Sequence, residues 1–358
     1  MSARVREVLG YLDGNFANIR AGIIGHYTAY KLLENNVHPD DILIVAKFHP
    51  GDESINYTSP YAGGNFSCIT GDDPDTLAYD KVTYTELGNL QRFLGGPQCG
   101  LDRYKSTEYF VEPPSERKIA SWKTYLYDLA ILREEDLPED VSYGIEYISW
   151  NFNCPKFLVS FQNLLKSLGV RFERRELKNI REAYYTDTKV VFNCTGLGSR
   201  SLGGVNDDKS FPMRGQVVVI KAPHIQENVM KWDAAKPTYI IKRPYSNDQL
   251  ILGGFLQKGD WTADTFREQT EDILKRTTEL YPKILEENRK GKRIEDLEIL
   301  RVVAGLRPGR EGGARIEKEF VDAGRVLIHN YGAAGYGYQA GIGMADKAVS
   351  LALDRSKL

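Results

Sequence analysis

The sequence predicts a mixed α/β (α+β) fold in which a discontinuous domain is interrupted by an inserted, mainly antiparallel β domain. Three observations favour this fold. Strand and helix segments with glycine-rich turns lie near both ends of the chain, the stretch from about 211 to 261 contains only short strands, and 358 residues exceed the usual size of one core. With 42% hydrophobic and 27% charged residues, the composition is that of an ordinary globular protein.

The first strand and helix segment contains a glycine turn. Residues 22 to 35 have helical spacing, and DILIVAKF at 41 to 48 suits a buried strand. A turn that receives a dinucleotide has the form G-x-G-x-x-G, and here Gly22 and Gly25 are present while Arg20 takes the first glycine position. The preceding stretch, YLDGNFANIR, is interrupted by polar residues and predicts only a poor strand.

The middle of the chain contains further elements. After a polar mixed region to about 142, a helix is expected at 154 to 168, with Pro155 in its first turn and Gly169 at its end. VRFERREL and KVVFNCTGLGSR follow as strands.

The β-rich block is predicted from QVVVIKAP, TYIIKRP and QLILGGFL, which are short enough for an antiparallel sheet. A helix is expected from Thr265, with a capping box to Glu268, and Pro282 ends it. The chain then predicts a strand, a glycine-rich turn and a terminal helix.

Charge and cysteine usage exclude several classes of protein. A formal net charge of -2 gives no reason to expect a nucleic acid or an anionic membrane as partner, and no apolar run approaches the length of a bilayer span. The cysteines have no C-x-x-C pair and no nearby histidine, so we expect no metal site and four reduced, mostly buried thiols. They are Cys68, Cys99, Cys154 and Cys194.

The last three residues, Ser356, Lys357 and Leu358, spell the address that the peroxisomal import receptor binds. We therefore expect this receptor as a partner and the peroxisomal matrix as the location. A second copy of the chain, giving a homodimer, is a further candidate partner.

Two motifs in the first half of the chain are candidates for ligand binding. NYTSPYAGGNF supplies hydroxyl groups, including Ser59, and bare backbone at Gly63 and Gly64, although an ordinary surface turn explains it equally well. Lys47 lies 22 residues after Gly25, where an acidic residue usually binds ribose hydroxyls. A lysine there favours an extra phosphate or is simply a solvated strand end.

Two motifs in the second half also allow both a ligand-binding and a purely structural interpretation. In VAGLRPGREGGARIE, a rigid turn presents Arg307, which suits a bidentate grip on a carboxylate, although most arginines merely lie on surfaces. In NYGAAGYGYQAGIG, glycines precede a helix whose positive end stabilises negative charge. Close packing of a terminal helix explains these glycines but not Tyr336 and Tyr338.

From about Gly22 to the C-terminus the chain resembles the yeast D-amino acid oxidases, which are FAD enzymes of the peroxisome. The motifs that support this resemblance are YTSPYAGGNF, FNCTGLG, RGQVVV, TYIIKRP, GGFLQKGDW, GLRPGREGG and HNYGAAGYGYQ, in this order. The resemblance implies a Rossmann-like FAD-binding domain at 1–85, 143–210 and 302–358, and a substrate domain at 86–142 and 211–301.

The resemblance also implies a cofactor site and a substrate site. Arg307 would bind the carboxylate of the substrate, the Tyr239 hydroxyl would be a further donor, and the Gly335 carbonyl would accept from the amino group. The substrate hydrogen on Cα would pass as hydride to flavin N5 without a side-chain base. The residues expected at FAD are Gly22, Ile24, Gly25, Lys47, Ser59, Gly63, Gly64, Asn65, Leu177, Thr195, Gly196, Arg307, Gly335, Tyr336, Gly337, Tyr338 and Gln339.

The implied reaction converts a D-amino acid and O₂ into a 2-oxo acid, ammonia and hydrogen peroxide. Phe255 and Leu256 stand where some members have a second tyrosine, which favours neutral D-amino acids. The alternatives are a D-aspartate oxidase, a noncatalytic relative that has lost FAD, and a pyridine-nucleotide dehydrogenase suggested by Lys47 alone. The resemblance stops near residue 21, so we expect weaker FAD binding because of Arg20 and hypothesise that the residues before it are not native.

Overall fold

The computed structural model describes residues 15–19, 21–322 and 324–354. The chain divides into two compact units. The first unit comprises the described residues up to Pro60, residues 158–211 and the described residues from 308 on, and the second comprises residues 61–157 and 212–307. These bounds differ from those of the predicted domains, since 61–85, 143–157 and 302–307 belong to the second unit. The reason is strand pairing, because residues 143–152 form a strand of the second sheet.

The first unit is built on a six-stranded sheet in the order β14-β15-β7-β1-β2-β6. All neighbours are parallel except β14, which pairs antiparallel with β15 at one edge. The apolar run of β2 confirms the strand predicted there and suits a parallel sheet with both faces covered. The strands are β1 (Asn15–Ile19), β2 (Ile42–Ala46), β6 (Arg171–Arg174), β7 (Thr188–Asn193), β14 (Arg315–Asp322) and β15 (Arg325–Tyr331).

Strand β1 corrects the expectation of a poor first strand. It pairs with β2 on one side and with β7 on the other, and Phe16 and Ala17 are buried. A central position supplies ladder hydrogen bonds from both neighbours and apolar contacts on both faces, which override weak intrinsic propensity. Arg20, at the first glycine position, lies outside the described residues.

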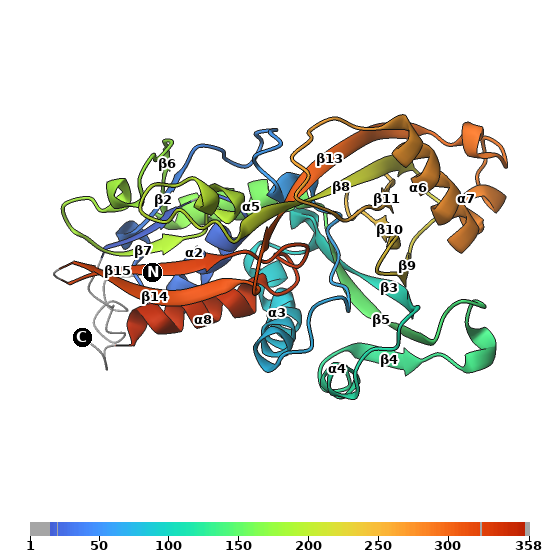
Figure 1. The fold of residues 1–358 in the computed structure, drawn as a ribbon, viewed down its shortest axis with the longest axis horizontal. Coiled ribbons are helices and arrows are strands. Elements are labelled where there is room, and N and C mark those ends of the chain that lie inside the picture. The colour runs from blue at the N-terminus through green and yellow to red at the C-terminus, as the bar shows by residue number, and fades with distance from the viewer. Residues whose placement is uncertain (1–14, 20, 323, 355–358) are drawn as a thin grey trace. The chain divides into compact units, whose positions relative to one another are not determined.

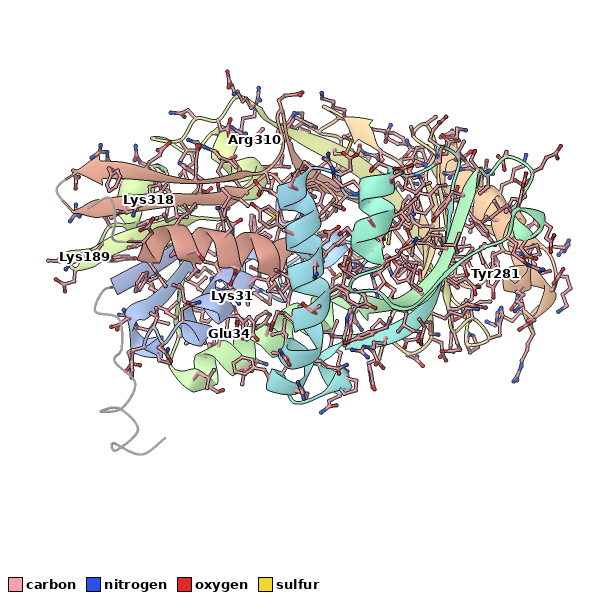
Figure 2. The ribbon with its side chains drawn as sticks, turned by 90° about the horizontal axis from the view of Figure 1, so that it is seen from below. Lys31, Glu34, Lys189, Tyr281, Arg310 and Lys318 are labelled. Atoms are coloured by element: carbon pink, nitrogen blue, oxygen red, sulfur yellow. The ribbon has the colours of Figure 1, made fainter. Side chains whose placement is uncertain are left out.

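Three helices of this unit confirm predictions. They are α2 (Ile23–Glu34), α5 (Cys154–Leu168), which begins in the second unit, and α8 (Gly341–Leu353). Helix α8 runs along β14 and β15 (Figure 1) and packs against α2. Figure 2 shows Lys31 and Glu34 close together, and the Lys31 ammonium lies 2.8 Å from Glu34 Oε2 and 2.9 Å from Asp346 Oδ1 of α8.

The second unit contains a nine-stranded sheet in the order β12-β8-β11-β10-β9-β3-β5-β4, with β13 paired to β8. The pairs along this order are antiparallel apart from β3 with β9, which confirms a mainly antiparallel domain. The strands are β3 (Leu101–Phe110), β4 (Tyr127–Ile131), β5 (Tyr143–Phe152), β8 (Ser210–Lys221), β9 (Asn228–Trp232), β10 (Thr238–Lys242), β11 (Gln249–Gly253), β12 (Gln257–Lys258) and β13 (Ile299–Arg310).

The polar region before residue 142 contains elements that its pattern did not predict, including β3, β4 and two helices. Helix α3 begins after Asp73, whose carboxylate accepts from the Thr76 amide at 2.9 Å, and Pro74 occupies its first turn. The remaining helices are α3 (Pro74–Phe93), α4 (Glu116–Trp122), α6 (Arg267–Leu280) and α7 (Lys283–Glu286). The 3₁₀ helices are η1 (Pro39–Asp41), η2 (Ser59–Tyr61), η3 (Pro97–Cys99), η4 (Glu134–Asp136), η5 (Ile180–Ala183), η6 (Gly196–Arg200) and η7 (Ile294–Asp296).

All four cysteines are buried and none forms a disulfide, which confirms the thiols expected from the sequence. In the part of the chain that the structure describes, no helix is long and apolar enough to cross a membrane. Within the same ranges, no group of three or more His, Cys, Asp or Glu side chains is placed to bind a metal ion.

Helix α6 shows that the predicted capping box is wrong. The helix begins at Arg267, two residues after Thr265, and its N-cap Phe266 has no side-chain cap of its own. The buried side chain of Gln216 replaces it: Oε1 accepts from the Phe266 amide at 2.8 Å and Nε2 donates to the Phe266 carbonyl at 2.9 Å. A cap from a distant strand gives no local sequence signal.

Replacing Gln216 by alanine should therefore destabilise the fold, whereas replacing the exposed Thr265 by alanine should not. The first change leaves the Phe266 amide without its partner, at a cost of about 1–3 kcal/mol, while the Phe266 carbonyl still accepts from the Thr270 amide. The second change should stay within about 0.5 kcal/mol. Urea unfolding of both variants measures the difference. A larger loss for Thr265→Ala than for Gln216→Ala would restore the capping box.

Candidate active site

The predicted cofactor residues of the first unit follow the ends of its parallel strands. Because β1, β2, β6, β7 and β15 are parallel, their carboxyl ends lie at one edge of the sheet. In open parallel sheets, ligands bind outside this edge. The residues that follow these ends are Gly22, Ile24 and Gly25 after β1, Lys47 after β2, Leu177 after β6, Thr195 and Gly196 after β7, and Gly335 to Gln339 after β15.

The start of α2 is shaped for an anionic group. Gly22 is the N-cap and makes no side-chain cap bond, and the first turn contains no acidic residue. Ser59 Oγ accepts from the Ile23 amide at 3.1 Å, and an ideal Cβ on Gly22 would lie only 3.1 Å from that oxygen. A bare backbone and a positive helix end without a competing carboxylate fit the pyrophosphate of FAD.

The NYGAAGYGYQAGIG segment lies against the same helix start. The Tyr338 hydroxyl donates to the Ser59 carbonyl at 2.9 Å, and the Tyr27 hydroxyl donates to the Tyr338 carbonyl at 3.3 Å. An ideal Cβ on Gly337 would lie 3.9 Å from side-chain atoms of Ile23 and Ile24. The structure therefore brings together parts of the glycine turn at Gly22, of NYTSPYAGGNF and of NYGAAGYGYQAGIG. These contacts explain Tyr338, which close helix packing alone left unexplained.

The glycine turn before α8 has a polar anchor that the sequence analysis missed. Asp207 Oδ2 accepts from the Tyr331 hydroxyl at 2.6 Å and lies 2.7 Å from Nε of Arg310, which Figure 2 labels. The Ala334 amide donates to the Pro308 carbonyl at 2.8 Å. Asp207 thus fixes the end of β15 to the end of β13, although nothing near it in the sequence marks it as such. The rigid turn predicted at Arg307 is wrong, because Ile299–Arg310 forms strand β13, which pairs with β8.

The turn after β7 is rigid and its cysteine is chemically inert. Thr195 Oγ1 donates to Asn193 Oδ1 at 2.7 Å, and Gly196 has a left-handed φ of 56°. Burial raises the pKa of the Cys194 thiol to about 12, so it stays protonated at neutral pH. Backbone and hydroxyl groups, rather than a thiolate, are what this turn offers to a ligand.

Lys47 forms an exposed ion pair with Glu176, at 2.8 Å between Nζ and Oε1. Half or more of each side chain is exposed, which agrees with the solvated strand end considered for Lys47. Leu177 packs in part against the cluster around Ala17 and Val191. The roles of Lys47 and Leu177 at FAD remain predictions.

In the second unit, Arg307 and Tyr239 are brought together. Arg307 NH2 donates to the Tyr239 hydroxyl at 3.2 Å, and NH1 donates to the Phe255 carbonyl at 3.1 Å. No Asp or Glu among the residues described forms an ion pair with Arg307. Each terminal nitrogen keeps a second N–H, and the Tyr239 hydroxyl keeps its own hydrogen, so this half-buried cation offers donors to an anion.

Gly63, Gly64 and Asn65 of the NYTSPYAGGNF segment also belong to the second unit. An ideal Cβ on Gly63 would lie 3.0 Å from Ile241 Cδ1 and 3.8 Å from the Tyr239 ring, so this segment crosses the sheet face that holds Tyr239. The Gly64 carbonyl accepts from the Phe152 amide at 2.7 Å, and Asn65 Nδ2 donates to Ser149 Oγ at 2.9 Å. The segment is thus held on β5.

The sheet face around Tyr239 is apolar. Its buried cluster includes Val217 and Ile241, with Trp232 and Val303 packed against it. The rings of Trp232 and Tyr239 are 6.5 Å apart, and Trp232 Nε1 donates to the buried Glu108 carboxylate at 2.6 Å. A ligand held by Arg307 would meet aliphatic and aromatic groups on this face.

Comparisons with known proteins identify the family of the chain. The family model "FAD dependent oxidoreductase" matches residues 21–351. A D-amino-acid oxidase of Schizosaccharomyces pombe is 42% identical over 343 residues, which cover 95% of this chain and 96% of that protein. A D-aspartate oxidase of Cryptococcus neoformans is 28% identical and covers 93% of this chain and 95% of its own.

The fold is also found in solved structures. An L-alpha-glycerophosphate oxidase from Mycoplasma pneumoniae, solved with FAD bound, has a TM-score of 0.71 and 16% sequence identity over 95% of both chains. A glycine oxidase from Geobacillus kaustophilus has a TM-score of 0.71 and 17% identity over 94% of both chains. At these identities the likeness shows the fold alone.

His26 lies in the first turn of α2 and is fully buried. Its Nδ1 lies 2.9 Å from the Gly22 carbonyl, its ring packs 5.4 Å from that of Phe161, and its Nε2 has no hydrogen-bond partner in the part of the chain described. Burial lowers the pKa of His26 to about 4. A neutral imidazole therefore supports the turn that would receive FAD.

This shift predicts acid sensitivity. Between pH 6.5, the ordinary pKa, and about 4, the unfolded chain binds a proton that the folded chain does not, so stability falls as the pH falls through this window. The free energy of unfolding should fall between pH 7 and 4, and replacing His26 by phenylalanine should make this fall smaller by roughly 3 kcal/mol. Urea unfolding at both pH values measures it, and an unchanged pH dependence would contradict a buried neutral His26.

Proposed function

Since the chain belongs to the family of FAD dependent oxidoreductases, we propose that it oxidises neutral D-amino acids to 2-oxo acids, ammonia and hydrogen peroxide. The observation that supports this best is Arg307, a cation held by two neutral oxygens with N–H groups left for a carboxylate. Water and O₂ complete the reaction, because the imino acid formed by oxidation takes up water and releases ammonia.

The edge of the first sheet supplies the cofactor site. Gly22 and the first turn of α2 would hold the pyrophosphate, as the bare backbone and the acid-free helix end support. Thr195 and Gly196 would lie at the adenine side, and Gly335 to Gln339 at the flavin. When bound, FAD would supply the acceptor for the hydride from Cα, which carries both electrons, and O₂ would be the final acceptor of these electrons.

The substrate site is proposed on the second unit. The Arg307 guanidinium binds the carboxylate through two hydrogen bonds, and the Tyr239 hydroxyl, which accepts from Arg307, donates its own hydrogen to the same group. Two charge-assisted bonds from a planar fork fix the carboxylate in orientation as well as in position. The protein then contributes orientation and charge, with no side-chain base.

The apolar face around Tyr239 supports neutral side chains. Val217, Ile241 and Trp232 offer no cation to a second carboxylate. Burying a carboxylate against such a face without a partner is costly, so D-alanine and larger apolar D-amino acids are the favoured substrates.

D-aspartate is the second candidate substrate class, and one observation favours it. Arg301 precedes Val303 by two positions on β13, so both side chains belong to the same face of the strand. The Arg301 guanidinium lies 5.9 Å from the centroid of the Tyr61 ring. A cation here would suit the second carboxylate of D-aspartate.

Peroxide formation separates these candidates. We expect the FAD-loaded chain to produce peroxide with D-alanine and none with L-alanine. Its kcat/KM for D-alanine should exceed that for D-aspartate at least roughly tenfold, because the second carboxylate of D-aspartate would be buried without a partner. A higher kcat/KM for D-aspartate that Arg301→Leu abolishes would establish the alternative. No peroxide with any D-amino acid, together with no FAD binding, would identify a noncatalytic relative.

We also propose the peroxisomal matrix as the location, which Ser356, Lys357 and Leu358 support. These residues lie outside the described part of the chain. A fluorescent protein fused ahead of the intact chain should enter peroxisomes, and removal of the three residues should leave it in the cytosol. Equal distribution of both fusions would refute this location.

A further inference from the structure

Arg307 and Tyr239 come from strands that are not neighbours. The sheet order places β8 beside β13, then β11, then β10, so two strands separate the backbone of Arg307 from that of Tyr239. Their side chains nevertheless meet, with 3.2 Å between Arg307 NH2 and the Tyr239 hydroxyl. The pair therefore spans the sheet face.

This reach is possible only if both side chains lie flat on the sheet. Strands are about 4.8 Å apart, so three spacings put β13 and β10 roughly 14 Å apart. Side chains normally stand perpendicular to a sheet, and a residue on β8 or β11 would occupy the space between the two. The strands that are crossed must be bare at that point.

Gly215 provides the bare position on β8. An ideal Cβ on Gly215 would lie 2.8 Å from NH2 and 2.9 Å from Cζ of Arg307, distances that real Cβ contacts essentially never show. The backbone of Gly215 is outside the left-handed region, so another residue could adopt its conformation. The position requires glycine because the guanidinium occupies the space of a side chain.

Gly253 provides the bare position on β11. It is the direct cross-strand partner of Tyr239, and of Val217 on the other side. Directly opposed residues share a face, so the Tyr239 ring extends over Gly253. An ideal Cβ on Gly253 would lie 2.5 Å from the Tyr239 hydroxyl, and one on Gly254 would lie 2.6 Å from Tyr239 Cζ.

We infer that Gly215 and Gly253 are positioning residues for the carboxylate-binding pair. This inference rests on the proposed function and extends it to two residues that have no side chain. Gly215 sets the height of the Arg307 guanidinium above the sheet, and Gly253 sets that of the Tyr239 hydroxyl. A methyl group at either position lifts the donors out of the plane in which they bind one carboxylate.

A double-mutant cycle tests Gly215. In the FAD-loaded chain, Gly215→Ala should raise the KM for D-alanine and the Kd for propionate, measured by calorimetry, at least tenfold, with a smaller change in kcat. In an Arg307→Lys background it should change both by less than twofold, because lysine has neither NH1 nor NH2 and its single, unforked ammonium group can move aside from the new methyl group. Gly88→Ala is the matched control, since its Cβ would meet nothing closer than 3.7 Å.

The cycle distinguishes positioning from a structural role. Equal effects of Gly215→Ala in both backgrounds, or no effect with Arg307 present, would overturn the inference. If Gly215→Ala fails to fold, recovery of folding in the Arg307→Lys background supports the inference, and failure in both contradicts it. A wild-type chain that binds propionate without oxidising D-alanine would refute the proposed function, while the propionate values would still decide the role of Gly215.

Discussion

The hydrogen bond between Arg307 and Tyr239 constrains four strands of the second sheet. It requires a cation on β13, a hydroxyl on β10 and the absence of side chains at the points of β8 and β11 that lie between them. Close packing makes this requirement strict, because a protein interior has no spare volume for one additional methyl group. Gly215 and Gly253 lie in ordinary strands, so neither flexibility nor turn geometry explains why these positions are glycines. The paths of the Arg307 and Tyr239 side chains explain both.

Both units contain positive charge that no adjacent acidic side chain among the described residues neutralises. In the first unit, the starts of α2 and α8 contain no acidic residue in their first turns. In the second, Arg307 donates to a hydroxyl and a carbonyl, which are neutral. Placing a cation among neutral acceptors costs stability, and the incoming anion restores the missing counter-charge. The arrangement suits a phosphate-bearing cofactor and a carboxylate substrate better than an uncharged ligand.

The sequence predicted the parts of this fold whose signals are local. The helix at 154–168, the buried strand before Lys47 and the glycine turn before α8 were predicted because periodicity, Pro155 and glycine spacing report local backbone preference. The motif residues were found for the same reason. The motif residues that follow β1, β2, β6, β7 and β15 lie at one edge of the first sheet because these strands are parallel.

The features that the sequence did not predict depend on distant partners. Strand β1 is stable because β2 and β7 flank it, and α6 begins where Gln216 of β8 caps it. Asp207 joins segments that are 103 residues apart along the chain. Only the path of the Arg307 side chain distinguishes Gly215 from an ordinary strand residue. Long-range contacts of this kind follow from topology, which local patterns do not encode.

The most direct test of the central claim compares D-alanine with D-alaninamide, which differ only in the carboxylate. The account predicts that the wild-type chain prefers D-alanine by at least roughly a hundredfold in kcat/KM, as two hydrogen bonds to a charged group imply, and that Arg307→Leu removes this preference. Equal kcat/KM values for the two compounds in the wild-type chain, or an unchanged preference in Arg307→Leu, would contradict the claim.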